Sequence, residues 1–196
     1  MRVLPYGPRA LLVELDDLDT VMSSSTQWRS AQIPGVIDVV PAARTILVVH
    51  DGTLDPNLLV PVSGPLPIVE TEVVEIPVAY DGEDLDELAA ETGLDVATII
   101  VRHTSALYRV AFCGFSPGFA YLVGLPVELH VTRRSTPRER VDAGSVAIAD
   151  GYSGIYPRRG PGGWRLLGHT DVVLWDESRT PPALLTPGAA VRFVAR

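Results

Sequence analysis

Short apolar runs alternate with one helical stripe over the first part of the chain. Four of the runs have the length of strands: 2–7, 10–15, 35–42 and 45–50. In residues 18–33 the apolar side chains recur at helical spacing, and Asp17 stands where a helix N-cap is expected. This order predicts a helix packed on one face of an antiparallel sheet, in a small α/β domain over residues 1–62.

A linker separates this domain from the rest. Residues 60–67 read VPVSGPLP, and their three prolines and one glycine are typical of a connecting segment. The alternation at 68–80 then predicts one long strand or a strand pair. Two short helices are predicted next, at 84–93 and 95–103. Gly93 stops the first of these helices, and Asp95 is placed to cap the second.

The pattern changes to short strands after residue 106. Glycine and proline turns divide four apolar runs at 107–112, 145–149, 163–175 and 189–195. Many short strands without regular crossover helices are typical of a closed or nearly closed barrel. The predicted class is therefore α+β, with a small N-terminal α/β domain followed by a β-barrel domain over residues 63–196.

Composition and charge exclude several functions. Hydrophobic residues make up 46% and charged residues 20%, an ordinary globular balance. The net charge of −8 disfavours a nucleic-acid partner, and Ile99, Ile100 and Val101 make the second helix a core element rather than a DNA-reading one. All 16 basic residues are arginine. Without a lysine the chain can form neither a Schiff base nor a P-loop.

The composition also indicates the cellular compartment in which we expect the protein. No apolar run approaches the length of a membrane span, so we expect no membrane partner. The N-terminus lacks a signal-peptide pattern, and Cys113 is the single cysteine. A lone thiol suits a reducing compartment. We therefore expect a cytoplasmic protein.

Glycines and arginines gather in one segment of the barrel. Seven arginines lie between residues 133 and 165, seven glycines lie between 144 and 168, and the arginine span holds only three acids, Glu139, Asp142 and Asp150. Arginine forks and exposed backbone N–H groups suit carboxylate and phosphate ligands. The alternative is a set of barrel turns whose arginines are solvated or paired with local acids. The sequence leaves both interpretations open.

Other candidate chemistry is sparse. The segment 113–126, CGFSPGFAYLVGLP, predicts either an aromatic loop at a pocket mouth or a hydrophobic loop folded over the barrel. The four histidines show no metal-binding spacing, so no metal ligands are expected. Acid–base candidates near the glycines are Asp142, Asp150, His169 and Asp171, and for each of them a surface or capping role is commoner than catalysis. Catalytic residues stay unassigned.

Four motifs carry a resemblance to a known family. They read GFSPGFAYLVGL, RRSTPRERVDAGSVAIADGYSGIYP, PGGWRLLGHT and LLTPGAAVRF, in this order. With them the chain resembles the allophanate hydrolase subunit 1 family, which includes the B-type subunit of 5-oxoprolinase and the KipI-type inhibitors of histidine kinases. The resemblance implies a small α/β domain followed by a cyclophilin-like β-barrel.

The resemblance also implies partners and an activity. A homologous subunit 2, of the KipA type or the C-type of 5-oxoprolinase, and a third subunit of the lactam-utilisation type would accompany this chain. Such a complex uses ATP, as a cofactor of the whole assembly, to open 5-oxoproline to glutamate. The alternatives within the family are a KipI-like kinase inhibitor and a component of urea carboxylase or allophanate hydrolase.

The matched motifs supply the candidate site residues. The ligand-binding set is Arg138, Ser145, Tyr156, Gly162, Gly163, Trp164, His169 and Thr170, and the pocket loop is Phe115, Pro117, Gly118 and Phe119. Because Pro137 fixes the backbone beside it, we expect Arg138 to bind an anion, in one pocket with His169 and the Gly162–Gly163 backbone. The family usually has arginine where this chain has His169, so anion binding there would be weaker or would depend on pH.

Overall fold

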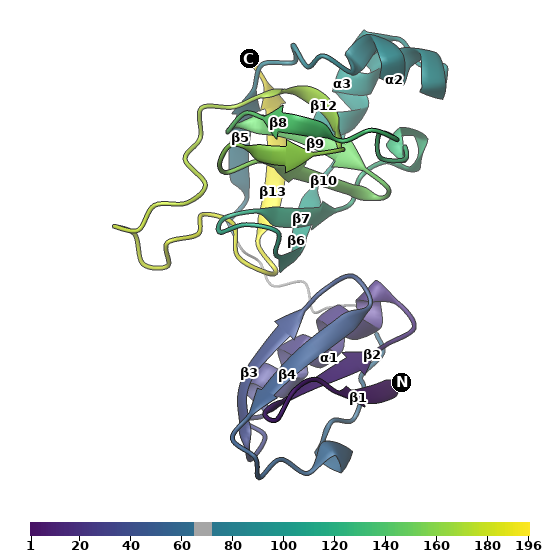
Figure 1. Cartoon of the computed structure of the whole chain (residues 1–196). Helices are drawn as coiled ribbons and strands as arrows, with labels where there is room; N and C mark the ends of the chain where they lie inside the picture. Colours follow the sequence, from purple (N-terminus) through teal and green to yellow (C-terminus); the bar gives the residue numbers. More distant parts are fainter. Residues whose placement is uncertain (65–71) are drawn as a thin grey trace. The chain divides into compact units, whose positions relative to one another are not determined.

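The computed structural model describes residues 1–64 and 72–196, which fall into two compact units, Met1–Glu70 and Thr71–Arg196 (Figure 1). Each unit has a hydrophobic core of its own. The first is a small α/β unit and the second is built around a barrel-like sheet. The predicted α+β class, with an α/β domain followed by a β-barrel, is therefore confirmed.

The N-terminal unit is a four-stranded sheet with one long helix. Its elements are β1 (Arg2–Pro5), β2 (Ala10–Glu14), α1 (Leu18–Ser30), β3 (Val36–Pro41), β4 (Thr45–His50) and the 3-10 helix η1 (Pro56–Leu58). The strands are antiparallel in the order β1-β2-β4-β3. The Asp17 carboxylate accepts a hydrogen bond from the N–H of Thr20 at 2.7 Å and caps α1. Val21 and Trp28 pack from α1 onto Val13 in the sheet, as the apolar pattern predicts.

The chain that leaves η1 stays attached to α1. The indole N–H of Trp28 donates a hydrogen bond to the carbonyl of Val60 at 2.9 Å. The hydroxyl of Ser23 donates another to the carbonyl of Gly64 at 2.7 Å. The predicted domain boundary between residues 62 and 63 falls inside this attached segment and stays a prediction.

The C-terminal unit contains a seven-stranded sheet, two helices and a separate two-stranded ribbon. Its elements are β5 (Val74–Val78), α2 (Leu85–Thr92), α3 (Val96–Ser105), β6 (Tyr108–Cys113), β7 (Ala120–Val123), η2 (Val127–Leu129), β8 (Arg138–Val141), β9 (Ser145–Ala149), β10 (Tyr152–Ile155), β11 (Gly160–Gly162), β12 (Arg165–His169) and β13 (Ala190–Ala195). The order in the sheet is β12-β9-β10-β7-β6-β13-β5, and β8 pairs with β11. Only the β5–β13 pair is parallel among these described strands.

Both predicted helices of this unit are confirmed with their terminal signals. Gly93 ends α2 in the left-handed region, with φ of 71°, which costs glycine nothing because it has no Cβ. The Asp95 carboxylate accepts a hydrogen bond from the N–H of Thr98 at 2.6 Å and caps α3. The ring of His103 on α3 stacks on Phe193 of β13 at 4.4 Å, which anchors α3 to the sheet.

Backbone contacts between its two edge strands nearly close the sheet into a barrel. The N–H and C=O groups of Ala79, just after β5, form two hydrogen bonds of 2.9 Å with His169 at the end of β12. Close approach is possible here because Gly168 lacks a side chain. A Cβ at that position would lie 2.0 Å from the Ala79 carbonyl oxygen. The predicted near-closed barrel is confirmed.

Alternation along the strands gives the sheet two apolar faces. Val146 and Ile148 of β9 join the main core of the barrel. Ala147 and Ala149 point to the opposite face, where they form a second cluster with aromatic side chains and with Val141 of the β8–β11 ribbon. The outer face of the barrel is thus partly covered and carries its own small core.

Some strands differ from the prediction. The strand expected at 163–175 is β12 alone, because the N–H of Thr170 turns back to bond the carbonyl of Gly144 at 2.9 Å. Four strands were not predicted: β7, β8, β10 and β11. In β10 a Cβ on Gly154 would lie 3.0 Å from the Trp164 ring. Glycine is needed at this position because an aromatic ring packs against it, and not because the chain turns there. Part of the strand expected at 68–80 lies outside the described residues.

The closure of the barrel yields a testable prediction. We expect Gly168→Ala to lower the free energy of unfolding by roughly 3 kcal/mol, because the new Cβ must displace the Ala79 carbonyl. Gly160→Ala is the matched control, since a Cβ there meets no atom within 4 Å. Urea-induced unfolding of both variants measures the difference. Equal stability would show that the contact between β12 and the residues after β5 does not hold the sheet closed.

Candidate functional site

A small aromatic pocket lies on the outer face of the barrel. Its volume is about 80 Å³, and it is lined by Phe115, Phe119, Tyr121, Arg133, Tyr156, Pro161, Gly162, Gly163 and Trp164. The loop before β7, the β7 strand, the residue after β10 and the β11–β12 connection supply the aromatic rings. The pocket therefore exists only when segments that are distant in sequence come together.

The rings of the pocket meet edge to face. The Phe119 ring lies 5.4 Å from the rings of both Tyr156 and Trp164, at interplanar angles of 80° and 86°. Aromatic rings favour this arrangement because the positive edge of one meets the negative face of the other. Gly162 is required beside them, since a Cβ there would lie 2.1 Å from the Tyr156 hydroxyl. The pocket wall is therefore closely packed.

The charge of Arg133 acts on the phenols of the pocket. Burial raises the pKa of Tyr156, while a backbone hydrogen bond from Trp164 and the charge of Arg133 oppose that shift. Burial likewise raises the pKa of Tyr121 against the same arginine charge. Both phenols are therefore neutral near pH 7 and offer hydrogen bonds rather than negative charge. The pocket combines apolar walls, hydroxyl groups and one cation.

Phe115 stands at this pocket in a strained turn. The N–H of Ser116 donates a hydrogen bond to the carbonyl of Gly114 at 2.7 Å, which closes a three-residue turn centred on Phe115. Its φ of 66° is costly for a residue with a bulky side chain. The side chain is nevertheless 59% exposed, with its ring edge near Phe119 and Tyr156. Strain held at a pocket points to a functional constraint.

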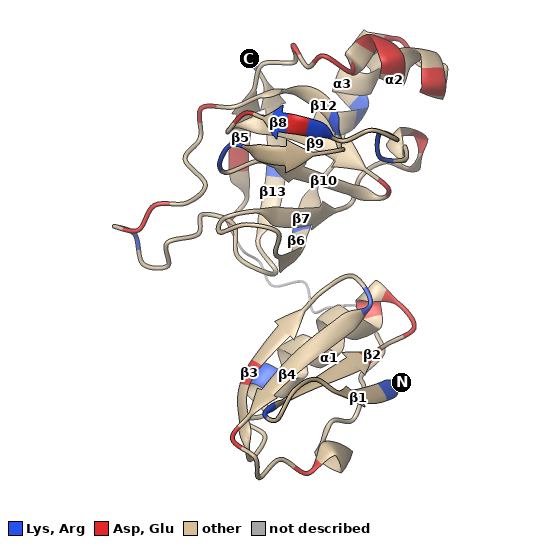
Figure 2. Ribbon diagram, viewed as in Figure 1, with Lys and Arg blue, Asp and Glu red and all other residues tan. Residues whose placement is uncertain are grey.

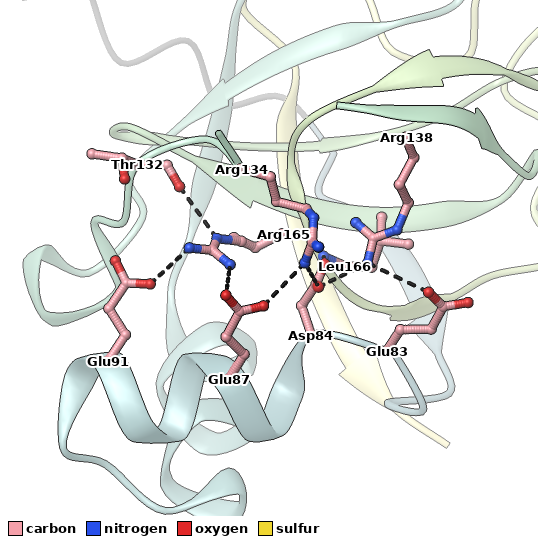
Figure 3. Close-up of polar contacts among 9 residues, drawn as sticks. All are labelled: Glu83, Asp84, Glu87, Glu91, Thr132, Arg134, Arg138, Arg165 and Leu166. Atoms are coloured by element: carbon pink, nitrogen blue, oxygen red, sulfur yellow. Dashed lines mark hydrogen bonds and ion pairs between the residues drawn. The ribbon is translucent and has the colours of Figure 1, made fainter. Parts of the chain in front are cut away.

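Most arginines of the glycine-rich segment meet acids instead of an open pocket. Figure 2 shows acidic residues concentrated on α2, close to basic residues of the neighbouring strands. Arg165 forms ion pairs with Glu87 at 2.7 Å and Glu91 at 2.9 Å. Arg134 also reaches Glu87, at 3.0 Å (Figure 3). The positive excess of this segment is therefore balanced by acids that come from more than 40 residues earlier in the chain.

Asp84 is the centre of this arrangement. Its carboxylate is 1% exposed and accepts hydrogen bonds from Arg134 at 2.7 Å, Arg138 at 2.8 Å and the N–H of Leu166 at 2.7 Å (Figure 3). Burial raises the pKa of Asp84, but the Arg138 and Leu166 hydrogen bonds and the two guanidinium charges outweigh burial, so the pKa lies below its usual range. Asp84 thus stays ionised and joins the start of α2 to the barrel.

Arg138 belongs to this cluster and is not among the residues lining the aromatic pocket. Beside its bond to Asp84 it contacts Glu83 at 3.4 Å. His169 is also elsewhere. Its Nδ1 lies 2.9 Å from Asp81 and its Nε2 lies 3.2 Å from the guanidinium of Arg196. Arg138 is the cross-strand partner of Gly162 in the β8–β11 ribbon, but its side chain contacts Asp84 and Glu83. Neither Arg138 nor His169 lines the aromatic pocket, and a ligand-binding role for either one stays a prediction.

Some of the other candidate residues line the aromatic pocket and the rest lie outside it. Six of the expected residues line the aromatic pocket: Phe115, Phe119, Tyr156, Gly162, Gly163 and Trp164. Ser145 is the cross-strand neighbour of His169, and Thr170 bonds the turn at Gly144. Pro117 and Gly118 lie in the Phe115 loop, where a Cβ on Gly118 would meet Trp175 at 2.9 Å. Arg133 and Tyr121 also line the pocket, and neither was in the expected ligand-binding set.

Two features are missing from the part of the chain that the structure describes. None of its helices combines the length and apolar character that crossing a membrane requires. In residues 1–64 and 72–196, no cluster of three or more His, Cys, Asp or Glu side chains is arranged to hold a metal ion.

Comparison with known proteins identifies the family. Residues 1–185 match the family model described as the carboxyltransferase domain, subdomain C and D. The chain belongs to this family. A relative from Escherichia coli O157:H7, named as the B-type subunit of 5-oxoprolinase, is 39% identical over an alignment of 210 residues that covers 96% of this chain and 93% of the relative. The protein of the same name from Bacillus subtilis (strain 168) is 36% identical over 182 residues, 82% of this chain and 76% of the relative.

Solved structures agree with this assignment. The crystal structure of TTHA0988 aligns with a TM-score of 0.80 and 36% identity over 96% of this chain, which spans 40% of the length of TTHA0988. The urea amidolyase of K. lactis aligns with a TM-score of 0.73 over 99% of this chain and 15% of its own, at 20% identity, a likeness in fold alone. The resemblance carried by the four sequence motifs is therefore confirmed.

The Asp84 cluster leads to a prediction about stability and pH. We expect Asp84→Asn to lower the free energy of unfolding at pH 7 by roughly 3 kcal/mol, because two guanidinium groups lose a buried anionic partner. The folded pKa of Asp84 lies below its ordinary value of 3.8, so its stabilisation is present above that value and is lost as the pH falls through the folded pKa. The gap between the two proteins should therefore narrow below about pH 4.

Denaturant unfolding at several pH values measures this gap. Asp86→Asn is the matched control, because Asp86 is an exposed acid on the same turn of α2. We expect it to change stability by less than about 0.5 kcal/mol at every pH. An Asp84→Asn protein as stable as this control would mean that the cluster contributes nothing to the fold.

The strained turn leads to a second prediction, which compares two replacements of Phe115. Phe115→Asn and Phe115→Ala both remove the ring, but asparagine tolerates a positive φ and alanine does not. We expect the asparagine variant to be more stable than the alanine variant by about 1 kcal/mol. Thermal and urea unfolding measure this difference. Identical stabilities would show that the turn relaxes when the ring is absent and that no strain is held there.

Proposed function

We propose that this chain is one component of a heteromeric, ATP-dependent 5-oxoprolinase that converts 5-oxoproline to glutamate. The main support for this proposal is the 39% identity to a B-type subunit of 5-oxoprolinase over nearly the full length of both chains. A homologous subunit 2, of the C-type of 5-oxoprolinase, and a third subunit of the lactam-utilisation type would complete the enzyme. A cytoplasmic location belongs to the same proposal.

The composition of the site supports a need for partner subunits. The aromatic pocket contains no carboxylate, histidine or thiol that could serve as an acid, base or nucleophile. His103 is fully buried, which lowers its pKa to about 3, and its ring nitrogens lie within hydrogen-bond distance of Tyr80 at 2.7 Å and Ser153 at 3.0 Å. It is therefore a neutral structural histidine. We propose that the reacting groups come from another subunit and that this chain alone is inactive.

Two hollows among the described residues do not suit ATP. The aromatic pocket, at about 80 Å³, is far smaller than the several hundred cubic ångströms that a nucleotide occupies. A larger hollow of about 460 Å³ in the N-terminal unit contains Arg2 and Arg44, but Glu14 and Asp16 also line it and would repel phosphates. The chain has no lysine to contact a phosphate. We propose that ATP binds to a partner subunit.

The alternatives within the family have less support. The relatives described above are named as subunits of 5-oxoprolinase and not as kinase inhibitors. The likeness to urea amidolyase is one of fold at 20% identity. A KipI-like role would require docking on a histidine kinase, and a urea carboxylase role would require a biotinylated partner.

An activity assay of the reconstituted complex tests the proposal. The chain is coexpressed with a subunit 2 and a lactam-utilisation subunit, the complex is purified, and glutamate release from 5-oxoproline is measured. We expect release that requires both ATP and this chain, with omission of either one as the control. A stable complex that hydrolyses no 5-oxoproline in the presence of ATP would overturn the proposal.

A further inference from the structure

The single charged side chain among the residues lining the aromatic pocket is Arg133. Its guanidinium carbon lies 5.9 Å from the centre of the Trp164 ring, within the range of a cation–π contact. All the other lining residues are aromatic or belong to the Pro161–Gly163 segment. A ligand in this pocket therefore meets flat apolar walls and one positive charge.

Arg133 makes fewer and longer contacts with acids than Arg134 and Arg165 do. Its ion-pair partner among the described residues is Asp150, at 3.4 Å, which is longer than a well-formed hydrogen bond. Its side chain is 56% exposed. Arg134 and Arg165, by contrast, each contact two acids, with their shortest contacts at 2.7 Å. Arg133 can therefore turn towards a ligand without breaking a buried ion pair.

The size and chemistry of the pocket define a class of ligand. A volume of about 80 Å³ admits one small ring, part of which would stay in the open mouth beside Phe115. Aromatic walls favour a flat ring, and a guanidinium fork favours a carboxylate with two parallel hydrogen bonds. The backbone between Pro161 and Trp164 forms the remaining wall. These features together describe a small ring acid.

We infer that Arg133 is the residue that recognises the carboxylate of a small ring acid bound between the aromatic side chains of this pocket. The identity of that acid as 5-oxoproline rests on the proposed function. In this arrangement the lactam ring contacts Trp164 and Phe119, and the carboxylate faces Arg133 at the pocket rim. Arg133 is thus a specificity-determining residue that selects the acid over the neutral lactam.

Binding of a ligand pair tests this inference. L-5-Oxoproline and 2-pyrrolidinone share the lactam ring, but only the first carries a carboxylate. Calorimetric titration of the full chain, alone and in the assembled complex, should show that the acid binds about tenfold or more tightly than the neutral lactam. Arg133→Gln should abolish this preference and leave 2-pyrrolidinone binding unchanged. Arg159→Gln is the matched control, because Arg159 is similarly exposed and pairs with one acid, Asp142.

Nuclear magnetic resonance gives the position of the ligand independently. The indole N–H signal of Trp164 should shift on addition of 5-oxoproline, while that of Trp28, buried in the N-terminal unit, should not. Single Trp28→Phe and Trp175→Phe variants assign the three signals. A shift confined to Trp28 or Trp175 would place the ligand elsewhere and overturn the inference.

The outcomes separate this inference from the proposed function. If Arg133→Gln keeps the preference for the acid, or if neither the chain nor the complex binds 5-oxoproline, the inference is wrong. An active complex whose Arg133→Gln variant has an unchanged KM would also overturn it and leave the proposed function intact. A complex without turnover, whose chain still binds the acid through Arg133, would overturn the function and keep the inference.

Discussion

The buried carboxylate of Asp84 is the interaction on which the barrel unit depends. One side chain accepts hydrogen bonds from two guanidinium groups and from the backbone of β12. An ionised group buried this deeply is stable only because each of these donors is in place. The same contacts attach the start of α2 to β12 and to the β8–β11 ribbon, and they balance the charge of Arg134 and Arg138. Without Asp84, Arg134 and Arg138 would lose the one buried acid that both of them contact.

Elements with local signals could be predicted from the sequence. Asp17 and Asp95 cap helices, and Gly93 ends one, because each acts on backbone groups within a few residues. The strand β10 could not be predicted, because its glycine serves a distant aromatic ring. Gly154 reads as a turn residue until Trp164 is placed against it. Composition identifies a glycine but not the neighbour that requires it.

The ion pairs near the candidate site could not be predicted from the sequence for the same reason. Arginine density suggested an anion site in this segment, and the motif with Pro137 suggested Arg138 as its ligand. The acids that meet Arg138 are Glu83 and Asp84, which lie just before α2 and about 54 residues earlier in the chain. The sequence contains no signal that pairs these two segments. The aromatic loop did predict a pocket from the sequence, since Phe115 and Phe119 line one in the structure. Arg133 differs from Arg138 only in its surroundings. Its position beside Trp164 could therefore not be predicted from the sequence and is known from the structure.

The pocket walls come from the Phe115 loop, β7, the segment at Arg133, the end of β10 and the β11–β12 connection. An unfolded chain cannot hold these groups within reach of one small molecule. Any ligand of the pocket therefore binds the folded barrel and not the unfolded chain. By thermodynamic linkage, such a ligand stabilises the folded barrel. At a ligand concentration 100 times its dissociation constant, the added free energy of unfolding is about 2.7 kcal/mol. In a cell rich in such a ligand, the abundance of this protein would rise with the supply of the molecule it binds.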